Sequence, residues 1–456
     1  MRKLTLGAAM AAALIPFASA ARAADADVEA LRREIQTMRQ TYEGRITDLE
    51  SKLNELEKVS PQPVTAATSS GGAAATSSVS GAGGRASGDT AFNPAIGLIL
   101  NGRFSAFSKD SSSFGGFAVG EEGERGKESF AIDESELNFS ASVDDKFAGS
   151  LTVAIVREDG ADKIELEEAY VKSLPGLGLP DGLGLKFGRA LWTFGALNEH
   201  HAHTDSFADR SLPYRAFLNN AFNDDGIEAS WVLPTDLYSE VGVGAFRGDD
   251  YPFGSTDGAK LGGWSAFGRI GGDIGPRQNW RLGGYVLSGT TDSRSTGEDA
   301  VIFAGDSRLY AVDLRYAWAP TGNAREQELS LLGEYMWRKE DGTYDDTGLG
   351  SGPIPYERNA SGWYVQAVYK FLPQWRAGLR YSRLDAPAVP AALIGGVLDA
   401  NGKNPSAQAA MLDWSNSEFS RFRLQYNHET LSSGQDDNQV ILQYIMSIGA
   451  HGAHMF

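Results

Sequence analysis

A period-two alternation of apolar and polar side chains runs through most of the chain from residue 95 onward. The stretch "RFRLQYN", residues 421–427, places Phe422, Leu424 and Tyr426 on one face and four polar or charged side chains on the other. Such alternation predicts β-strands that have one apolar and one polar face. The alternation is equally compatible with a soluble sandwich and with a barrel in a membrane. The number of strands and the lengths of their connections distinguish the two folds.

The pattern predicts sixteen strands, and their connections alternate between short turns and long polar loops. The expected strands are 95–107, 130–143, 148–158, 164–173, 184–193, 224–233, 238–247, 263–272, 279–289, 307–318, 328–338, 362–371, 375–384, 407–414, 420–428 and 438–449. An even strand number, with both barrel ends on the side of the short turns, is typical of closed outer-membrane barrels. The sequence therefore predicts an all-β fold, a sixteen-stranded antiparallel transmembrane β-barrel. The strand at 407–414 has the weakest pattern.

The first 23 residues have the pattern of a secretory signal peptide. Two basic residues precede a short apolar run and small residues, which predicts cleavage after Ala20 or Ala23. The rest of the chain has no run of about 18 apolar residues of the kind a membrane helix requires. Together with the strand pattern, this favours a location in a bacterial outer membrane.

Between the signal peptide and the first strand the sequence changes character twice. Residues 25–59 repeat apolar side chains every three or four positions, from Val28 to Leu56, which predicts a short self-associating coiled coil in the periplasm. Residues 60–92 are rich in Gly, Ser and Ala and predict a flexible linker. The barrel is expected to occupy residues 93–456.

The composition excludes several kinds of chemistry. The chain has no cysteine, so any metal ion has to be held by nitrogen and oxygen ligands. Its formal charge of −18 becomes −21 when Arg2, Lys3 and Arg22 leave with the signal peptide. A charge of this sign argues against nucleic acid as a partner and favours cations.

Several stretches resemble the porin family that includes the phosphate-selective porins. They are "IELEEAYVKSLPG", "LGLKFGRALWTFG" and "DWSNSEFSRFRLQYN", and the tail "GAHGAHMF" resembles a subgroup associated with metal-responsive or siderophore-related uptake. The resemblance implies a homotrimer and diffusive transport. It does not imply phosphate, because 59 acidic residues outnumber 41 basic ones.

The lumen is expected to carry charges of both signs. Strand alternation turns these residues inward: Arg103, Glu136, Arg376, Arg380, Arg421 and Arg423. Acidic loops such as "RKEDGTYDDTG" favour cations at a pore mouth. They are equally explained by solubility or by divalent ions that bridge lipopolysaccharide, while the arginines leave passage open to anions.

Three of the six histidines lie in "NEHHAHTD", within the third long loop, residues 194–223. In general porins this loop folds into the barrel, so we expect it to form the constriction with Glu199, His200, His201, His203, Asp205, Asp209 and Arg210. Imidazole with carboxylate suits Zn²⁺ or another divalent metal, held weakly. The candidate metal ligands are His200 and His203 and, at the other barrel end, His451 and His454.

These features predict passive diffusion of small solutes, among them cations, divalent metals or metal chelates, with no resident cofactor. One alternative is a structural barrel that the coiled coil tethers to peptidoglycan, and another is a siderophore or bulky-solute uptake barrel. An enzyme is not expected, because the neighbours in "HTDS" seldom acquire triad geometry. A TonB-dependent receptor would need a plug domain, which the N-terminal segment cannot form.

Overall fold

The structure, a computed structural model, describes residues 94–109, 113–158, 161–254, 261–296, 300–432 and 435–449. The predicted signal peptide, coiled coil and linker lie outside the described residues, as do His451 and His454. No helix among the described residues is long and apolar enough to cross a membrane.

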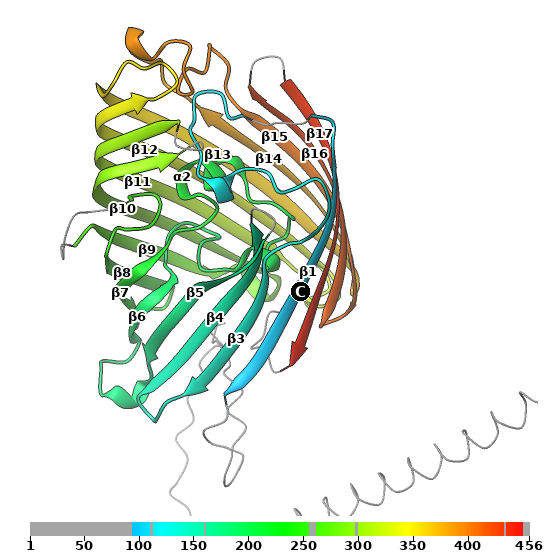
Figure 1. Cartoon of the computed structure of the whole chain (residues 1–456). Helices are drawn as coiled ribbons and strands as arrows, with labels where there is room; N and C mark the ends of the chain where they lie inside the picture. The colour runs from blue at the N-terminus through cyan, green and yellow to red at the C-terminus, as the bar shows by residue number, and fades with distance from the viewer. Residues whose placement is uncertain are drawn as a thin grey trace, which may run out of the picture. The chain divides into compact units, whose positions relative to one another are not determined.

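Antiparallel strands make up most of the described chain (Figure 1). They are β1 (Ala95–Phe107), β2 (Ser129–Ile132), β3 (Ser135–Ser142), β4 (Phe147–Glu158), β5 (Ala161–Ser173), β6 (Leu183–Leu191), β7 (Asn223–Val232), β8 (Tyr238–Phe246), β9 (Gly263–Asp273), β10 (Gln278–Thr296), β11 (Val301–Trp318), β12 (Glu328–Asp346), β13 (Ile354–Leu372), β14 (Trp375–Asp385), β15 (Ser406–Ser417), β16 (Ser420–Ser432) and β17 (Gln435–Gly449). The short helices are η1 (Glu121–Gly123), η2 (Pro175–Leu177), η3 (Ala202–Thr204), α2 (Leu212–Leu218), η4 (Gly275–Arg277) and η5 (Ala391–Leu393).

The sheet closes on itself because its first and last strands pair. β1 and β17 are in register from Gly97 opposite Gly449 to Phe107 opposite Gln439. β2 and β3 both pair with β1, one after the other, so they share one position in the wall and the barrel has sixteen positions. The sixteen-stranded prediction is confirmed, including the stretch 407–414, which lies in β15. The expected single strand 130–143 is instead broken at Asp133 and Glu134.

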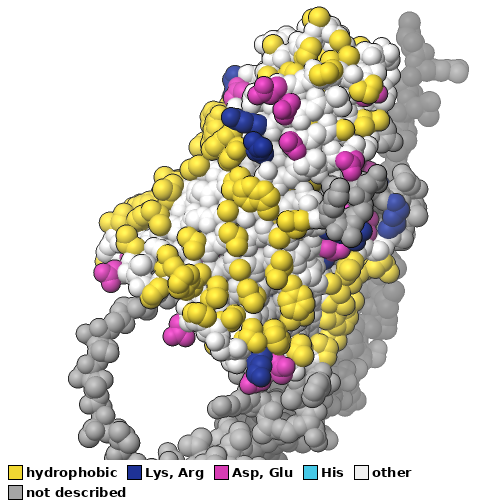
Figure 2. All heavy atoms as spheres, turned by 90° about the vertical axis from the view of Figure 1, so that its left-hand side faces the viewer, with side chains coloured by type: hydrophobic (Ala, Val, Ile, Leu, Met, Phe, Trp, Pro, Cys, Tyr) yellow, Lys and Arg dark blue, Asp and Glu magenta, His cyan; other side chains and the backbone are white. Residues whose placement is uncertain are grey.

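The wall is apolar outside and polar inside, the reverse of a soluble protein. On β16 the outward Phe422, Leu424 and Tyr426 are 42%, 51% and 47% exposed, whereas the inward Arg421 and Gln425 are 1% and 0% exposed. Figure 2 shows apolar side chains spread over one face of the wall and charged side chains gathered toward its ends. Lipid in contact with the outer face accounts for this arrangement.

β10 to β13 are longer than the sequence predicts. β10, β12 and β13 contain 19 residues each, nearly twice the 9–11 or so that a strand needs to cross a bilayer. The expected loop 339–361 is therefore mostly strand, and only residues 347–353 connect β12 to β13. Beyond the bilayer the outward face no longer has to be apolar, so the alternation disappears from the sequence while backbone pairing continues.

The main apolar cluster lies within the barrel and is built by chain that folds inward. Trp192, Phe194, Phe217 and Phe222, from the connection between β6 and β7, are at most 1% exposed. They pack with wall residues such as Phe246. Burial of these large side chains is the main force that holds the connection inside the lumen.

Candidate functional site

The connection between β6 and β7, residues 192–222, forms the candidate site and is here called the inward segment. It carries η3 and α2, and Figure 1 shows α2 within the barrel. Pro213 lies in the first turn of α2, where its missing N–H costs nothing, and Asn219 ends the helix in a left-handed conformation with φ of 51°. All seven residues of α2 are buried.

Hydrogen bonds fix both ends of the inward segment to each other. The Asn198 amide nitrogen donates to the carbonyl oxygens of Trp192 and Phe222, each at 2.8 Å, and its oxygen accepts from the Phe222 N–H at 2.6 Å. Asn198 is fully buried. The wall adds two carboxylate contacts, since Glu228 accepts from Thr193 and Glu334 accepts from the Ala196 N–H. The segment is therefore held at several points along its length.

Glu199 and His200 are the exposed residues of the predicted constriction. The Glu199 side chain is 33% exposed and pairs with Arg269 on β9. Burial alone would raise the pKa of Glu199, but Arg269 lowers it to about 2. Glu199 is therefore an anion at neutral pH, although the charge of Arg269 offsets much of its field.

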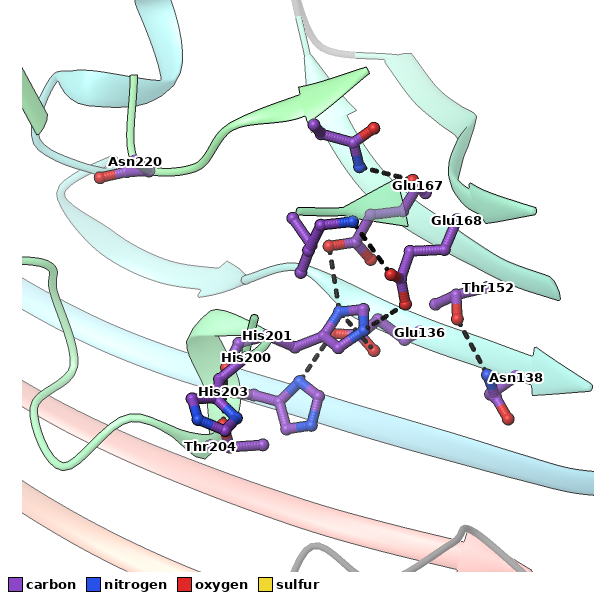
Figure 3. A network of polar contacts seen from close by, with 12 residues as sticks. Glu136, Asn138, Thr152, Glu167, Glu168, His200, His201, His203, Thr204 and Asn220 are labelled. Carbon is purple, nitrogen blue, oxygen red and sulfur yellow. Dashed lines mark hydrogen bonds and ion pairs between the residues drawn. The ribbon is translucent and has the colours of Figure 1, made fainter. Parts of the chain in front are cut away.

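His201 and His203 point toward carboxylates of β3 and β5 (Figure 3). His201 Nδ1 lies 3.1 Å from Glu167 Oε1 and 3.3 Å from Glu136 Oε2, and its Nε2 lies 3.0 Å from Glu168 Oε2. His203 Nδ1 lies 2.6 Å from Glu136 Oε1. Burial alone would lower the pKa of His201, but Glu167 and Glu136 raise it well above its ordinary value. The two rings stack, with centroids 5.7 Å apart.

A β-bulge accounts for the two adjacent carboxylates beside His201. Along β5, Glu168 pairs with Thr152 and Leu166 pairs with Val153, so Glu167 has no partner on β4. A bulge of this kind interrupts strict alternation. It allows both Glu167 and Glu168 to reach His201, which a regular strand would prevent.

An arginine cluster flanks the other side of the same turn. Arg423 on β16 donates to the Asp205 carbonyl at 2.7 Å, and Arg421 donates to the His203 carbonyl at 2.6 Å. Farther along, Asp205 pairs with Arg210 at 3.0 Å. The turn that carries the histidines thus lies between acidic groups of β3 and β5 and basic groups of β16.

The remaining predicted lumen residues also contact inward groups. Asp209 pairs with Arg380 at 2.8 Å, and the positive charges of Arg380 and Arg215 outweigh burial and lower the pKa of Asp209. Arg103 pairs with Asp133 at 3.0 Å. Arg376 pairs with Asp413 at 2.7 Å. Most predicted charges are therefore bound in ion pairs inside the barrel.

Two of the predicted metal ligands, His200 and His203, lie within the described residues. His200 is exposed and His203 contacts Glu136, while His201 is the histidine that has carboxylates on both sides of its ring. Glu134, Glu167 and Glu168 are not among the residues predicted from the sequence. The signals that could have pointed to them are the acidic stretches "DESE", residues 133–136, and "IELEE", residues 164–168.

Comparisons with known proteins find a solved outer-membrane channel with the same fold. No family model matches the chain. An uncharacterized protein of Aquifex aeolicus (strain VF5) is 28% identical over 397 residues, which is 80% of each chain. The solved outer-membrane channel DcaP of Acinetobacter baumannii aligns with 78% of this chain and 96% of its own, at 13% identity and a TM-score of 0.50. Pseudomonas putida OprB aligns with 78% of this chain and 94% of its own, at 12% identity and a TM-score of 0.49.

Proposed function

We propose that this chain is an outer-membrane porin that lets small hydrophilic solutes diffuse through a lumen narrowed by the inward segment. The observation that carries the proposal is a closed sixteen-position barrel with an apolar exterior, a polar interior and a long connection folded inside. A barrel of this size encloses an aqueous channel when its lumen is not filled. The fold shared with the channel DcaP agrees with this function. The resemblance to phosphate-selective porins remains a prediction.

Cations are the solutes that the charges favour. The exposed carboxylates at the inward segment are Glu199 and, beside Asn219 and Asn220, Glu122 of η1. The chain as a whole also carries a formal charge of −18. Carboxylates that line a pore raise the local concentration of cations. The arginines of β14 and β16 oppose this effect only in part, because Asp413 neutralises one of their charges.

Reversal potentials across a potassium chloride gradient in planar bilayers test whether the chain forms a channel and whether that channel prefers cations to anions. We expect the wild-type chain to conduct and to favour K⁺. Glu199→Gln removes the most exposed carboxylate of the segment and leaves Arg269 with Glu240 as its counter-charge, so the cation-to-anion permeability ratio should fall by about two- to fivefold. Asp236→Asn, in the exposed turn after β7, is the matched control and should leave the ratio unchanged. A wild-type channel that favours Cl⁻ contradicts the cation proposal.

A structural barrel is the second candidate function, because part of the interior is densely packed. Arg421, Arg423 and Gln425 line β16 and are at most 1% exposed even though they face inward. If side chains and the inward segment fill the whole cross-section, the barrel would serve as an anchor for the predicted N-terminal coiled coil. Wild-type protein that inserts into bilayers and carries no measurable current would favour this function over diffusion.

We further propose that three copies assemble through the outer face of β2 to β5. Phe130, Ile132 and Ile164 stand out from this face with exposures of 85%, 68% and 78%. These exposures exceed the 42–51% of the outward side chains on β16, so these side chains stand farther out of the wall and can pack against a neighbouring copy. Phe130→Asp combined with Ile132→Asp should convert the detergent-solubilised trimer to monomer, measured by light scattering corrected for detergent. Wild-type protein that is already monomeric would exclude the trimer.

A further inference from the structure

Four potential metal ligands meet where the inward segment touches the barrel wall. They are His201 of the segment, Glu136 of β3, Glu134 just before β3, and Glu167 at the bulge of β5. One ligating atom from each lies within 4.8 Å of all the others. Since these residues come from three separate parts of the chain, only the folded barrel brings them together.

Glu136 offers an oxygen atom that is aimed into this cluster. The residue is 1% exposed, and its Oε1 is engaged by His203 at 2.6 Å. Its Oε2 accepts no hydrogen bond from the described residues and lies 3.3 Å from His201 Nδ1. A buried carboxylate oxygen whose one partner is an ion pair at 3.3 Å keeps part of its desolvation cost, and a bound cation would offset that cost.

Glu168 orients His201 in the way that histidine ligands of metals are usually oriented. Its Oε2 lies 3.0 Å from His201 Nε2, on the far side of the ring from the cluster. A metal-bound histidine typically donates its other ring N–H to a carboxylate or carbonyl oxygen. His201 Nε2 can keep this contact while Nδ1 gives up its proton to solvent and binds a metal ion instead.

Charge also favours a cation at this point. Glu134, Glu136, Glu167 and Glu168 place four carboxylates around one imidazole ring, and the negative charges repel one another. Closely spaced carboxylates need a proton or a cation between them. A divalent ion supplies two positive charges at the centre of the cluster, where one imidazolium supplies a single charge.

We propose that Glu134, Glu136, Glu167 and His201 bind one divalent first-row transition metal ion, with Glu168 as a positioning residue. One imidazole nitrogen with carboxylate oxygens suits Zn²⁺ and Mn²⁺ better than Mg²⁺, which prefers oxygen ligands alone. The ion links the inward segment to β3 and β5. Metal binding does not depend on conduction, so it is tested independently of the proposed channel.

Isothermal titration of the purified full-length protein in detergent with ZnCl₂ tests the site. We expect Glu136→Gln and His201→Asn each to abolish one zinc equivalent per chain. Glu168→Gln should keep the stoichiometry and weaken binding about tenfold. His428→Asn, on β16 and bonded to Asn438, is the matched histidine control and should bind as the wild type does. Zinc uptake by Glu136→Gln and His201→Asn equal to that of the wild type would overturn the proposal.

X-ray absorption on the wild-type protein gives an answer even if the variants do not fold. With one zinc equivalent bound, we expect a single imidazole and otherwise oxygen ligands at about 2.0–2.2 Å. Two or more imidazoles per zinc would place the ion on another histidine set, such as His200 with His203, and would overturn this assignment. Wild-type protein that binds no zinc overturns it as well.

Discussion

Replacing residues 195–219 with a short Gly-Ser linker is expected to raise the single-channel conductance about threefold or more, because a sixteen-stranded barrel without inward chain encloses a wide aqueous channel. The deleted residues include α2, whose side chains are all buried inside the barrel. Their removal also breaks the contacts of Asp209 and Tyr214 with the wall. Planar-bilayer recordings in potassium chloride measure the change directly.

A second deletion controls for general damage to the barrel. Residues 347–353 connect β12 to β13 at the end of the long strands, and a shorter turn there should leave the conductance near that of the wild type. Folding of both proteins is checked by their heat-modifiable mobility on gels. If loss of the inward segment leaves the conductance unchanged while the barrel folds, the segment does not control the channel.

Most of the barrel can be predicted from the sequence because contact with lipid requires an apolar side chain at every second residue of a strand. Phe422, Leu424 and Tyr426 face lipid, so the residues that alternate with them face inward. The seven residues 421–427 are therefore enough to predict the strand. The weak stretch 407–414 could be assigned because a closed barrel needs an even number of strands. Where lipid contact ends, as in the outer half of β12, the constraint ends too and the prediction was wrong.

The candidate site could be predicted only in outline. The inward position of the histidine loop follows from its place between the fifth and sixth predicted strands. The choice between His200 and His201 does not, because it depends on which ring reaches β3 and β5. The bulge at Glu167 decides that contact, and a bulge arises from the pairing of two strands rather than from the residues of one.

Asp413→Asn is expected to destabilise the folded barrel by about 3–5 kcal/mol, because it leaves buried arginines without a counter-charge. Asp413 is 0% exposed and accepts from Arg423 Nε at 2.9 Å and from Arg376 Nε at 2.8 Å. Arg421 Nε is 3.9 Å away. Asparagine keeps the size of the side chain, so the lost free energy of unfolding reports on charge rather than on packing. Urea unfolding in detergent, followed by tryptophan fluorescence, measures this free energy.

Asp385→Asn is the matched control, since Asp385 pairs with Arg383 at 3.0 Å but both side chains are about two-fifths exposed. An exposed pair of this kind contributes at most about 1 kcal/mol, so the control should lose little. Equal losses of unfolding free energy in the Asp413 and Asp385 variants would mean that water around β16 screens the charges there. If the interior is as dry as the burial indicates, adding Arg421→Gln to Asp413→Asn should restore part of the stability, because it removes one of the mutually repelling arginines. That recovery separates repulsion among the arginines from the mere loss of two hydrogen-bond partners.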